Sequence, residues 1–331
     1  MKYKLVAFWL VVFGALFAFL QTRFEYHFYY IEQSQLFLFS EAYIRNKLVL
    51  PGGFSMLVAE FFVQFFIRPY VGALVTAALL TGVGICTAGI VKRIASASGL
   101  FILYVQPMLA LLFMHFDFNY RVQGTVCYLM TALLCGYIRI RNDLFRLVAG
   151  CVLVPVLFWL AGSIAVLFAG MICLFEGLRK TPKWYISLIG VAEVLLLGVG
   201  TVYFSLMGEY RWVFGPDLYY HYTLHPKEII YYSWICLPLV FLVAFFIRNK
   251  NSLSGKKLFA GISCIAQLAM IAAVLWWGMP KYSDAKTLKL KKLDYFARTE
   301  QWDKTIEECK GKLTNFLYLC IVTDVLQRVA V

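Results

Sequence analysis

Long apolar runs recur along almost the whole of this 331-residue chain, and they limit what it can fold into more than any other feature. A helix that crosses the hydrocarbon layer of a bilayer needs about 20 mostly apolar residues, with about 17 as a practical lower limit. The runs that meet or approach this length are 5–20, 70–91, 99–115, 122–138, 147–161, 164–177, 184–206, 230–247 and 258–278. We therefore expect an all-α, polytopic membrane bundle over residues 1–278 with about nine spans, and a short helical tail over residues 279–331.

The composition supports a membrane protein and argues against other classes. Hydrophobic residues make up 62% of the chain and charged residues 15%, whereas a soluble domain has about 45–50% and about 25%. The net charge of +13 would suggest nucleic acid in a soluble protein, but membrane insertion itself selects basic residues in short loops between apolar spans. We expect contacts with membrane lipids and no nucleic-acid partner. Most of the nine cysteines lie inside apolar runs and do not predict disulfides.

Two apolar segments have lengths that need interpretation. Residues 147–177 would be about 46 Å long as one helix, and Gly162 followed by Ser163 offers a turn, so a hairpin of two spans is expected. Residues 1–20 combine two lysines with an apolar run but are not followed by an A-x-A-like cleavage site. They therefore predict an uncleaved signal anchor.

The run from Phe54 to Ile67 is expected to lie at the membrane surface. It is about 21 Å long as a helix, and Glu60, Gln64 and Arg68 recur every four residues along one face. A polar stripe of this kind is typical of an interfacial helix and not of a spanning one. This interpretation matters because one additional span would reverse the orientation of everything after it.

The distribution of basic residues predicts the orientation of the bundle. With nine spans, the loops on the side of the N-terminus contain twelve basic residues: Lys92, Arg93, Arg139, Arg141, Arg146, Arg179, Lys180, Lys183, Arg248, Lys250, Lys256 and Lys257. The opposite loops contain four: Arg68, Arg121, Arg211 and Lys227. Because cytoplasmic loops are enriched in Lys and Arg, the N-terminus is expected in the cytoplasm and the C-terminus outside. Any chemistry is then expected on the outer side, which receives the longer loops.

The C-terminal tail has a different composition from the rest of the chain. Residues 284–312 are rich in charged, helix-favouring residues, with apolar residues spaced for two amphipathic helices around a turn near Thr299. This pattern resembles a single tetratricopeptide-type hairpin. About three stacked repeats are needed for a stable solenoid. We therefore expect the tail either to be truncated or to fold back onto the membrane domain, and it is also a candidate surface for a protein partner.

The first outer loop supplies two candidate catalytic carboxylates. Glu25 and Glu32 are seven residues apart, so both would face the same way on a helix, with Tyr29 beside them. One of them is a candidate general base or metal ligand. The alternative is that Glu32 only hydrogen-bonds to Tyr and Gln neighbours or reaches toward water.

A third candidate, Asp117, stands in the short loop "MHFDFNYR". His115 and Arg121 are close to it in the sequence. A carboxylate and an imidazole at this separation are candidates to share a divalent cation. An Asp–Arg pair that caps two helix ends is the equally supported alternative.

The third outer loop, residues 207–229, contains His221, His225 and Lys227 among many aromatic residues. Two histidines four residues apart fit a zinc site, but spacing fixes no third ligand. An aromatic belt at the headgroup level is the structural alternative. Tyr and His at such a place would also suit sugar hydroxyls and phosphates.

The order of these features resembles the GT-C superfamily of glycosyltransferases, which use polyprenyl-phosphate-linked sugars. The shared features are one span, a long outer loop with acids and an interfacial helix, a short second outer loop with an acid, further spans and an outer helical tail. In that superfamily an acid in the first loop acts as a base or positions the acceptor, and acids in the second loop help to bind a metal or the donor phosphate. The resemblance implies the first role for Glu25 or Glu32 and the second for Asp117.

Two stretches are similar to an uncharacterised family of Bacteroidetes membrane proteins. They are "YYIEQSQLFLFSEAYIRNKLVLPGGFSMLVAEFFVQFF" and "LDYFARTEQWDKTIEECK". Members of that family run longer and continue the C-terminal repeat, which implies a shortened member. The resemblance also implies a multi-pass protein of a bacterial inner membrane, with the C-terminus in the periplasm.

Together these observations lead to a GT-C-like glycosyltransferase as the main functional hypothesis. The hypothesis gives Glu32, Glu25 and Asp117 catalytic roles, with a divalent cation as an open requirement. The residues expected to contact the substrate are Arg121, His115, Tyr29, His221 and Lys227. A non-enzymatic scaffold that recruits a partner through the tail is the alternative. A transporter is less supported, because Glu193 is nearly alone as a charge within the spans.

Overall fold

The computed structural model describes residues 2–95, 100–248, 257–283, 285–308 and 323. All regular elements within these residues are helices, and the single extended contact among them is an isolated bridge between Tyr120 and Tyr220. Six helical segments are long and apolar enough to cross a membrane: Leu5–Ser34, Val71–Ile94, Asp143–Arg179, Trp184–Tyr203, Ile229–Ile247 and Gly261–Tyr282. The expected all-helical membrane class is therefore confirmed.

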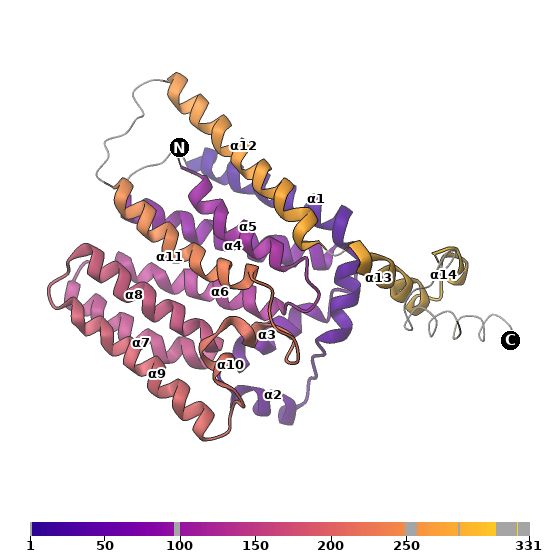
Figure 1. Cartoon of the computed structure of the whole chain (residues 1–331), viewed down its shortest axis with the longest axis horizontal. Helices are drawn as coiled ribbons and strands as arrows, with labels where there is room; N and C mark the ends of the chain where they lie inside the picture. Colours follow the sequence, from indigo (N-terminus) through magenta and orange to yellow (C-terminus); the bar gives the residue numbers. More distant parts are fainter. Residues whose placement is uncertain (1, 96–99, 249–256, 284, 309–322, 324–331) are drawn as a thin grey trace.

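In the described part of the chain, nine helices of 13–33 residues form the bundle, whose arrangement Figure 1 shows. They are α1 (Lys2–Ser34), α4 (Val71–Ile94), α5 (Ile102–Met114), α6 (Val122–Leu134), α7 (Asp143–Ala161), α8 (Ala165–Arg179), α9 (Ser187–Tyr203), α11 (Ile229–Ile247) and α12 (Lys257–Tyr282). The remaining helices are α2 (Glu41–Leu48), α3 (Gly53–Val63), α10 (Tyr210–Phe214), α13 (Ala285–Arg298) and α14 (Trp302–Glu308). Single 3₁₀ turns occupy Cys135–Arg139, Gly162–Ile164, Trp184–Ile186 and Pro216–Tyr219.

The loops divide between two ends of the bundle. The start of α1 and the C-terminal ends of α4, α6, α8 and α11 lie at one end in Figure 1. The end of α1, residues 35–70, residues 115–121, residues 204–228 and α13 lie at the other end. We call this second end the loop face. It collects all the candidate catalytic and binding residues that the sequence indicates.

The first helix continues beyond the expected end of its span. α1 runs to Ser34, with a kink at Phe24, where the backbone has φ −127° and ψ 17°. The polar residues that follow the apolar run therefore belong to the same helix and not to a loop. Glu25, Tyr29 and Glu32 lie together on the part of α1 after the kink.

The hairpin of α7 and α8 turns at Gly162, which has φ +81°. Residues 50–53 of the first loop dock against this turn, and the Gly52 N–H donates to the Trp159 carbonyl at 3.0 Å. A side chain at Gly52 would meet the backbone of Ala161 at 3.2 Å, and Gly52 itself has φ +77°. Glycine at position 52 thus allows both the turn and the close approach.

A buried ion pair holds α7 to α8 at the end of the bundle opposite the loop face. The Arg146 side chain is fully buried and donates to both carboxylate oxygens of Glu176, at 2.7 and 2.8 Å. The Thr181 hydroxyl also donates to Glu176, at 2.6 Å. The sequence indicated Arg146 only as a loop charge. It gave no signal that Glu176, at the end of an apolar run, would be its partner.

The helix in the first loop is shorter than its apolar run. α3 ends at Val63, so Arg68 lies beyond it and leaves the expected polar stripe. Glu60 is 7% exposed and is covered by α2, where the Lys47 amine lies 3.1 Å from the carboxylate and the Tyr43 hydroxyl donates to it. This pairing fastens α2 onto α3.

The described part of the tail contains two helices. α13 and α14 are joined by a turn in which Glu300 has φ +57°. α13 packs against the second part of α1, as Figure 1 shows. Residues 309–322 and 324–331, and with them the end of the expected repeat, lie outside the described residues.

Candidate functional site on the loop face

Asp117 is the most tightly held carboxylate on the loop face. It is 5% exposed. One oxygen accepts the Tyr220 hydroxyl at 2.5 Å and lies 3.0 Å from the Lys227 amine. The other accepts the Asn119 backbone N–H at 3.0 Å. Burial alone would raise the pKa of Asp117, but hydrogen bonds from Tyr220, Asn119 and Lys227 outweigh it, so the pKa lies below its usual value.

Backbone pairing between two loops positions Asp117. The Arg121 N–H donates to the Tyr219 carbonyl at 2.9 Å, beside the bridge between Tyr120 and Tyr220. The Asp117 carboxylate also closes a local turn over Asn119, a common role of Asp in short loops. The structure therefore brings together two regions that are about 100 residues apart, as the 103-residue separation of Asp117 and Tyr220 shows.

The space next to Asp117 is small. A cavity of about 10 Å³ is lined by Met114, Asp117, Tyr120, Tyr220, Lys227, Ile229 and Ile230. That volume corresponds to about one water molecule. The Lys227 side chain, which lines this cavity, is 44% exposed.

His115 lies close to Asp117 in sequence but binds a different group. Its Nε2 lies 2.8 Å from the Thr125 hydroxyl in a buried environment, and its ring packs edge-on against Tyr120. Among the described residues, no group of three or more His, Cys, Asp and Glu side chains is arranged to hold a metal. The polar groups that surround the Asp117 carboxylate include the Lys227 amine and the Tyr220 phenol.

Arg121 is a half-buried cation that experiences the charge of Glu60. Burial lowers the pKa of its guanidinium, and the negative charge of Glu60 opposes this effect. Glu60 makes its short contacts with Tyr43 and Lys47 instead. Within the described part of the chain, Arg121 makes no ion pair at 4.0 Å or less.

Glu25, Tyr29 and Glu32 face the tail helix. Glu32 pairs with Arg298 at 3.0 Å, and the same guanidinium donates to the Tyr29 carbonyl at 3.4 Å. The Tyr29 hydroxyl donates to Glu25 at 2.9 Å, and its ring stacks on Tyr295 with the centroids 4.3 Å apart. These residues therefore form the surface of α1 against which α13 packs.

The two candidate regions touch through aromatic rings and not through their carboxylates. Phe24 stacks on Phe116 with the centroids 4.4 Å apart, and Tyr30 meets Phe118 edge-on at 5.4 Å. The Lys291 amine lies 5.2 Å from the centroid of the Phe118 ring. The structure gives Asp117 different partners from those of Glu25 and Glu32.

The two histidines of the third loop do not share a partner. His221 Nδ1 lies 2.9 Å from the Thr223 hydroxyl, whereas His225 Nδ1 lies 3.5 Å from Arg211. Tyr220 and Lys227 are the residues of this loop that reach Asp117. The sequence did not indicate that Tyr220 and Asn119 bind Asp117. Tyr220 could not be singled out because the loop contains many tyrosines.

Removing Arg298 is expected to loosen the tail. Arg298→Ala breaks the contacts with Glu32 and with the Tyr29 carbonyl, and partly exposed contacts of this kind are worth about 1 kcal/mol. Hydrogen exchange in α13 of the purified protein should therefore rise by about five- to tenfold. The matched control, Lys289→Ala, removes a positive charge from the same helix. Equal exchange in the two variants would contradict the assignment.

Comparison with known proteins identifies a family but no activity. A model of the family of unknown function DUF6057 matches residues 1–324. No curated protein and no solved structure matches the chain. The expectation of an uncharacterised membrane-protein family is confirmed, because the match covers nearly the whole chain. The chain belongs to the DUF6057 family, a family of unknown function.

Proposed function

We propose that the loop face of this membrane protein lies outside the cytoplasm of a bacterial inner membrane. The basic residues at the ends of α4 and α8 lie at the end of the bundle opposite the loop face. In this proposal the nine long helices each cross the bilayer once, and α2 and α3 stay on the outer side. α5 and α6 have 13 residues each, which is about 20 Å, so the bilayer thins around them or their flanking residues extend the crossing.

The orientation is tested with two single cysteines in exposed loops. Thr223→Cys places a thiol on the loop face, and Arg141→Cys places one at the opposite end. A membrane-impermeant maleimide added to intact spheroplasts should label the cysteine at position 223. The cysteine at position 141 should react only after lysis. The reverse pattern would contradict the orientation.

We further propose that the protein transfers a sugar from a lipid-phosphate carrier to an acceptor on the loop face. The observation that carries this proposal is the ionised Asp117 carboxylate, held beside Lys227 and close in sequence to Arg121. Asp117 takes the proton of the acceptor hydroxyl as the acceptor oxygen attacks the anomeric carbon. The bond from the sugar to the phosphate breaks, and the lipid phosphate leaves with the electron pair.

Positive charge on the loop face stabilises the leaving phosphate in this proposal. Lys227 moves from Asp117 to the phosphate, which also opens the cavity beside the carboxylate. The guanidinium of Arg121, which stays protonated, supplies a second positive charge. Asp117 is the single carboxylate lining the cavity, and a hard cation would need further oxygen ligands, so the proposal assigns the phosphate charge to these two side chains.

The proposal gives Glu25 and Glu32 a structural role. Glu32 pairs with Arg298 of α13, and Glu25 accepts a hydrogen bond from Tyr29, which stacks on α13. Its test is the pair Asp117→Asn and Asp217→Asn. Asp217 is 8% exposed and accepts the Tyr231 hydroxyl at 3.2 Å, so it is a buried loop-face carboxylate of the same kind. Only the change at Asp117 should stop sugar transfer.

A membrane scaffold is the second candidate function. The observation that favours it is the docking of α13 on α1, which holds the tail in one position on the loop face. A scaffold needs no ionised Asp117. It would therefore keep its function in the Asp117→Asn variant, provided that the tail stays docked.

A further inference from the structure

The surface of α7 carries an exposed apolar stripe along its whole length. Its members recur every three or four residues and are 44–63% exposed: Phe145, Val148, Val152, Val156 and Trp159. This α7 stripe is about 21 Å long. Such a stripe on a membrane-length helix is the surface that meets acyl chains, because nothing polar interrupts it.

The α7 stripe ends beside α2. The Trp159 carbonyl accepts the Gly52 N–H at 3.0 Å, so the stripe meets the first loop at this point. Val49, three residues before Gly52, is 50% exposed, and Leu48 is 44% exposed. These two exposed apolar residues at the C-terminal end of α2 therefore lie three and four residues before the point where the first loop contacts α7.

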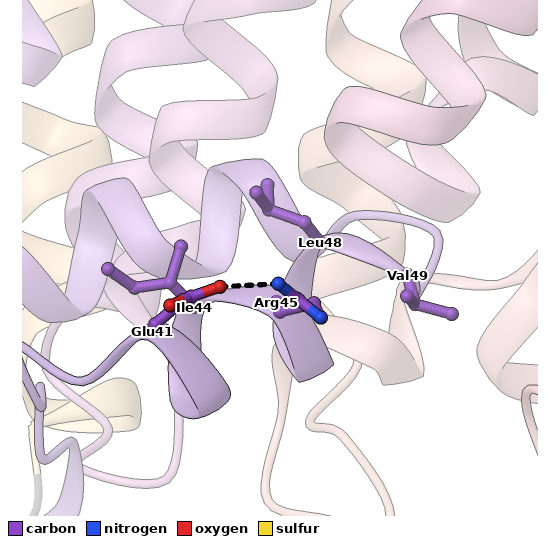
Figure 2. Close-up of a pocket in the computed structure, with 5 residues that line it drawn as sticks. All are labelled: Glu41, Ile44, Arg45, Leu48 and Val49. Carbon is purple, nitrogen blue, oxygen red and sulfur yellow. Dashed lines mark hydrogen bonds and ion pairs between the residues drawn. The ribbon is translucent and has the colours of Figure 1, made fainter.

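One face of α2 is bound to α3, and the opposite face is exposed. Tyr43 and Lys47 bind Glu60 of α3, which fixes the helix. The opposite face borders a shallow pocket, shown in Figure 2, that is wide open to solvent because all its lining residues belong to α2 and its C-cap. The pocket residues are Glu41, Ile44, Arg45, Leu48 and Val49. Three apolar side chains thus lie next to a single carboxylate and a single guanidinium.

The charges at the pocket match a zwitterionic headgroup. Arg45 and Glu41 pair with each other, but their side chains are 73% and 81% exposed. Separating an exposed pair of this kind costs little. The guanidinium can then bind a phosphate, as arginine does well, while the carboxylate meets an ammonium group.

We propose that this pocket binds a phospholipid with a zwitterionic, amine-bearing headgroup. Its phosphate faces Arg45, its ammonium faces Glu41, and one acyl chain lies along Val49, Trp159 and the rest of the α7 stripe. The position of exposed apolar residues just before the contact with a membrane-length helix favours a lipid over a protein as the occupant. This inference does not depend on sugar transfer.

Photoactivatable lipids test the inference on the full chain in nanodiscs. Phosphatidylethanolamine with a diazirine near the end of one acyl chain should label residues 44–49 and 152–159, and phosphatidylglycerol with the same diazirine should label them less. Val49→Asp should lower this labelling about tenfold, because a carboxylate among acyl chains is costly. Labelling at Leu196 of α9, which is 74% exposed, should stay unchanged and shows that the bundle is intact.

A milder variant, Leu48→Ser, should lower the labelling in the same direction. The proposal is overturned if labelling of residues 44–49 is insensitive to Val49→Asp, or if phosphatidylglycerol labels them equally well. Cross-links from this segment to a second copy of the chain or to another protein, in place of lipid, would also overturn it.

Discussion

Replacing Glu176 by alanine is expected to destabilise the protein by about 3–5 kcal/mol, because removing one partner of a buried ion pair leaves the other charge buried without compensation. The remaining charge would be that of Arg146, whose side chain is fully buried. Asp143 lies 2.8 Å from it but is 39% exposed and also pairs with Arg179 at 3.4 Å, so it compensates only in part. The midpoint of heat-induced unfolding of the purified protein in detergent measures the loss.

Two further variants make this prediction specific. The double change Arg146→Met and Glu176→Leu should recover most of the stability, because apolar residues of similar size can replace a buried pair at little cost. Glu209→Ala removes a partly exposed ion pair with Arg211 and should change the stability by less than about 1 kcal/mol. A double variant as unstable as the single one would contradict the explanation from uncompensated charge.

The sequence predicts the helical membrane class well, because membrane crossing is encoded locally. Apolar runs of sufficient length and a glycine at the turn, such as Gly162, are visible in short windows. The buried pair at the opposite end of the bundle is less visible. Glu176 reads as the polar end of an apolar run, and its partner Arg146 is 30 residues earlier.

The sequence indicated individual residues of the candidate site but not which of them are in contact. The charge pattern places Asp117 and Lys227 on the same side of the membrane, yet spacing gives no sign that they meet. The same holds for Glu32 and Arg298, which are 266 residues apart. Because helix packing decides these contacts, the sequence does not show that Glu32, a candidate catalytic carboxylate, also pairs with Arg298 of α13.

Asp117→Asn is expected to have the largest effect on function. The carboxamide keeps the size of the side chain and can still accept the Tyr220 hydroxyl, but it takes no proton from an acceptor. Loss of a general base typically lowers a rate by about 10²- to 10⁴-fold. Asp217→Asn should leave the rate near that of the unaltered protein, because Asp217 binds Tyr231 and is absent from the cavity beside Asp117.

The most direct test of the proposed transfer compares cell-surface glycans in strains that carry each variant as their single copy of the protein. Equal amounts in the membrane, and equal maleimide labelling of the cysteine introduced at position 223, show that each variant is inserted correctly. The account predicts that at least one glycan loses a sugar residue in the Asp117→Asn strain and keeps it in the Asp217→Asn strain. Glycan profiles in the Asp117→Asn strain that match those of the unaltered strain would contradict it.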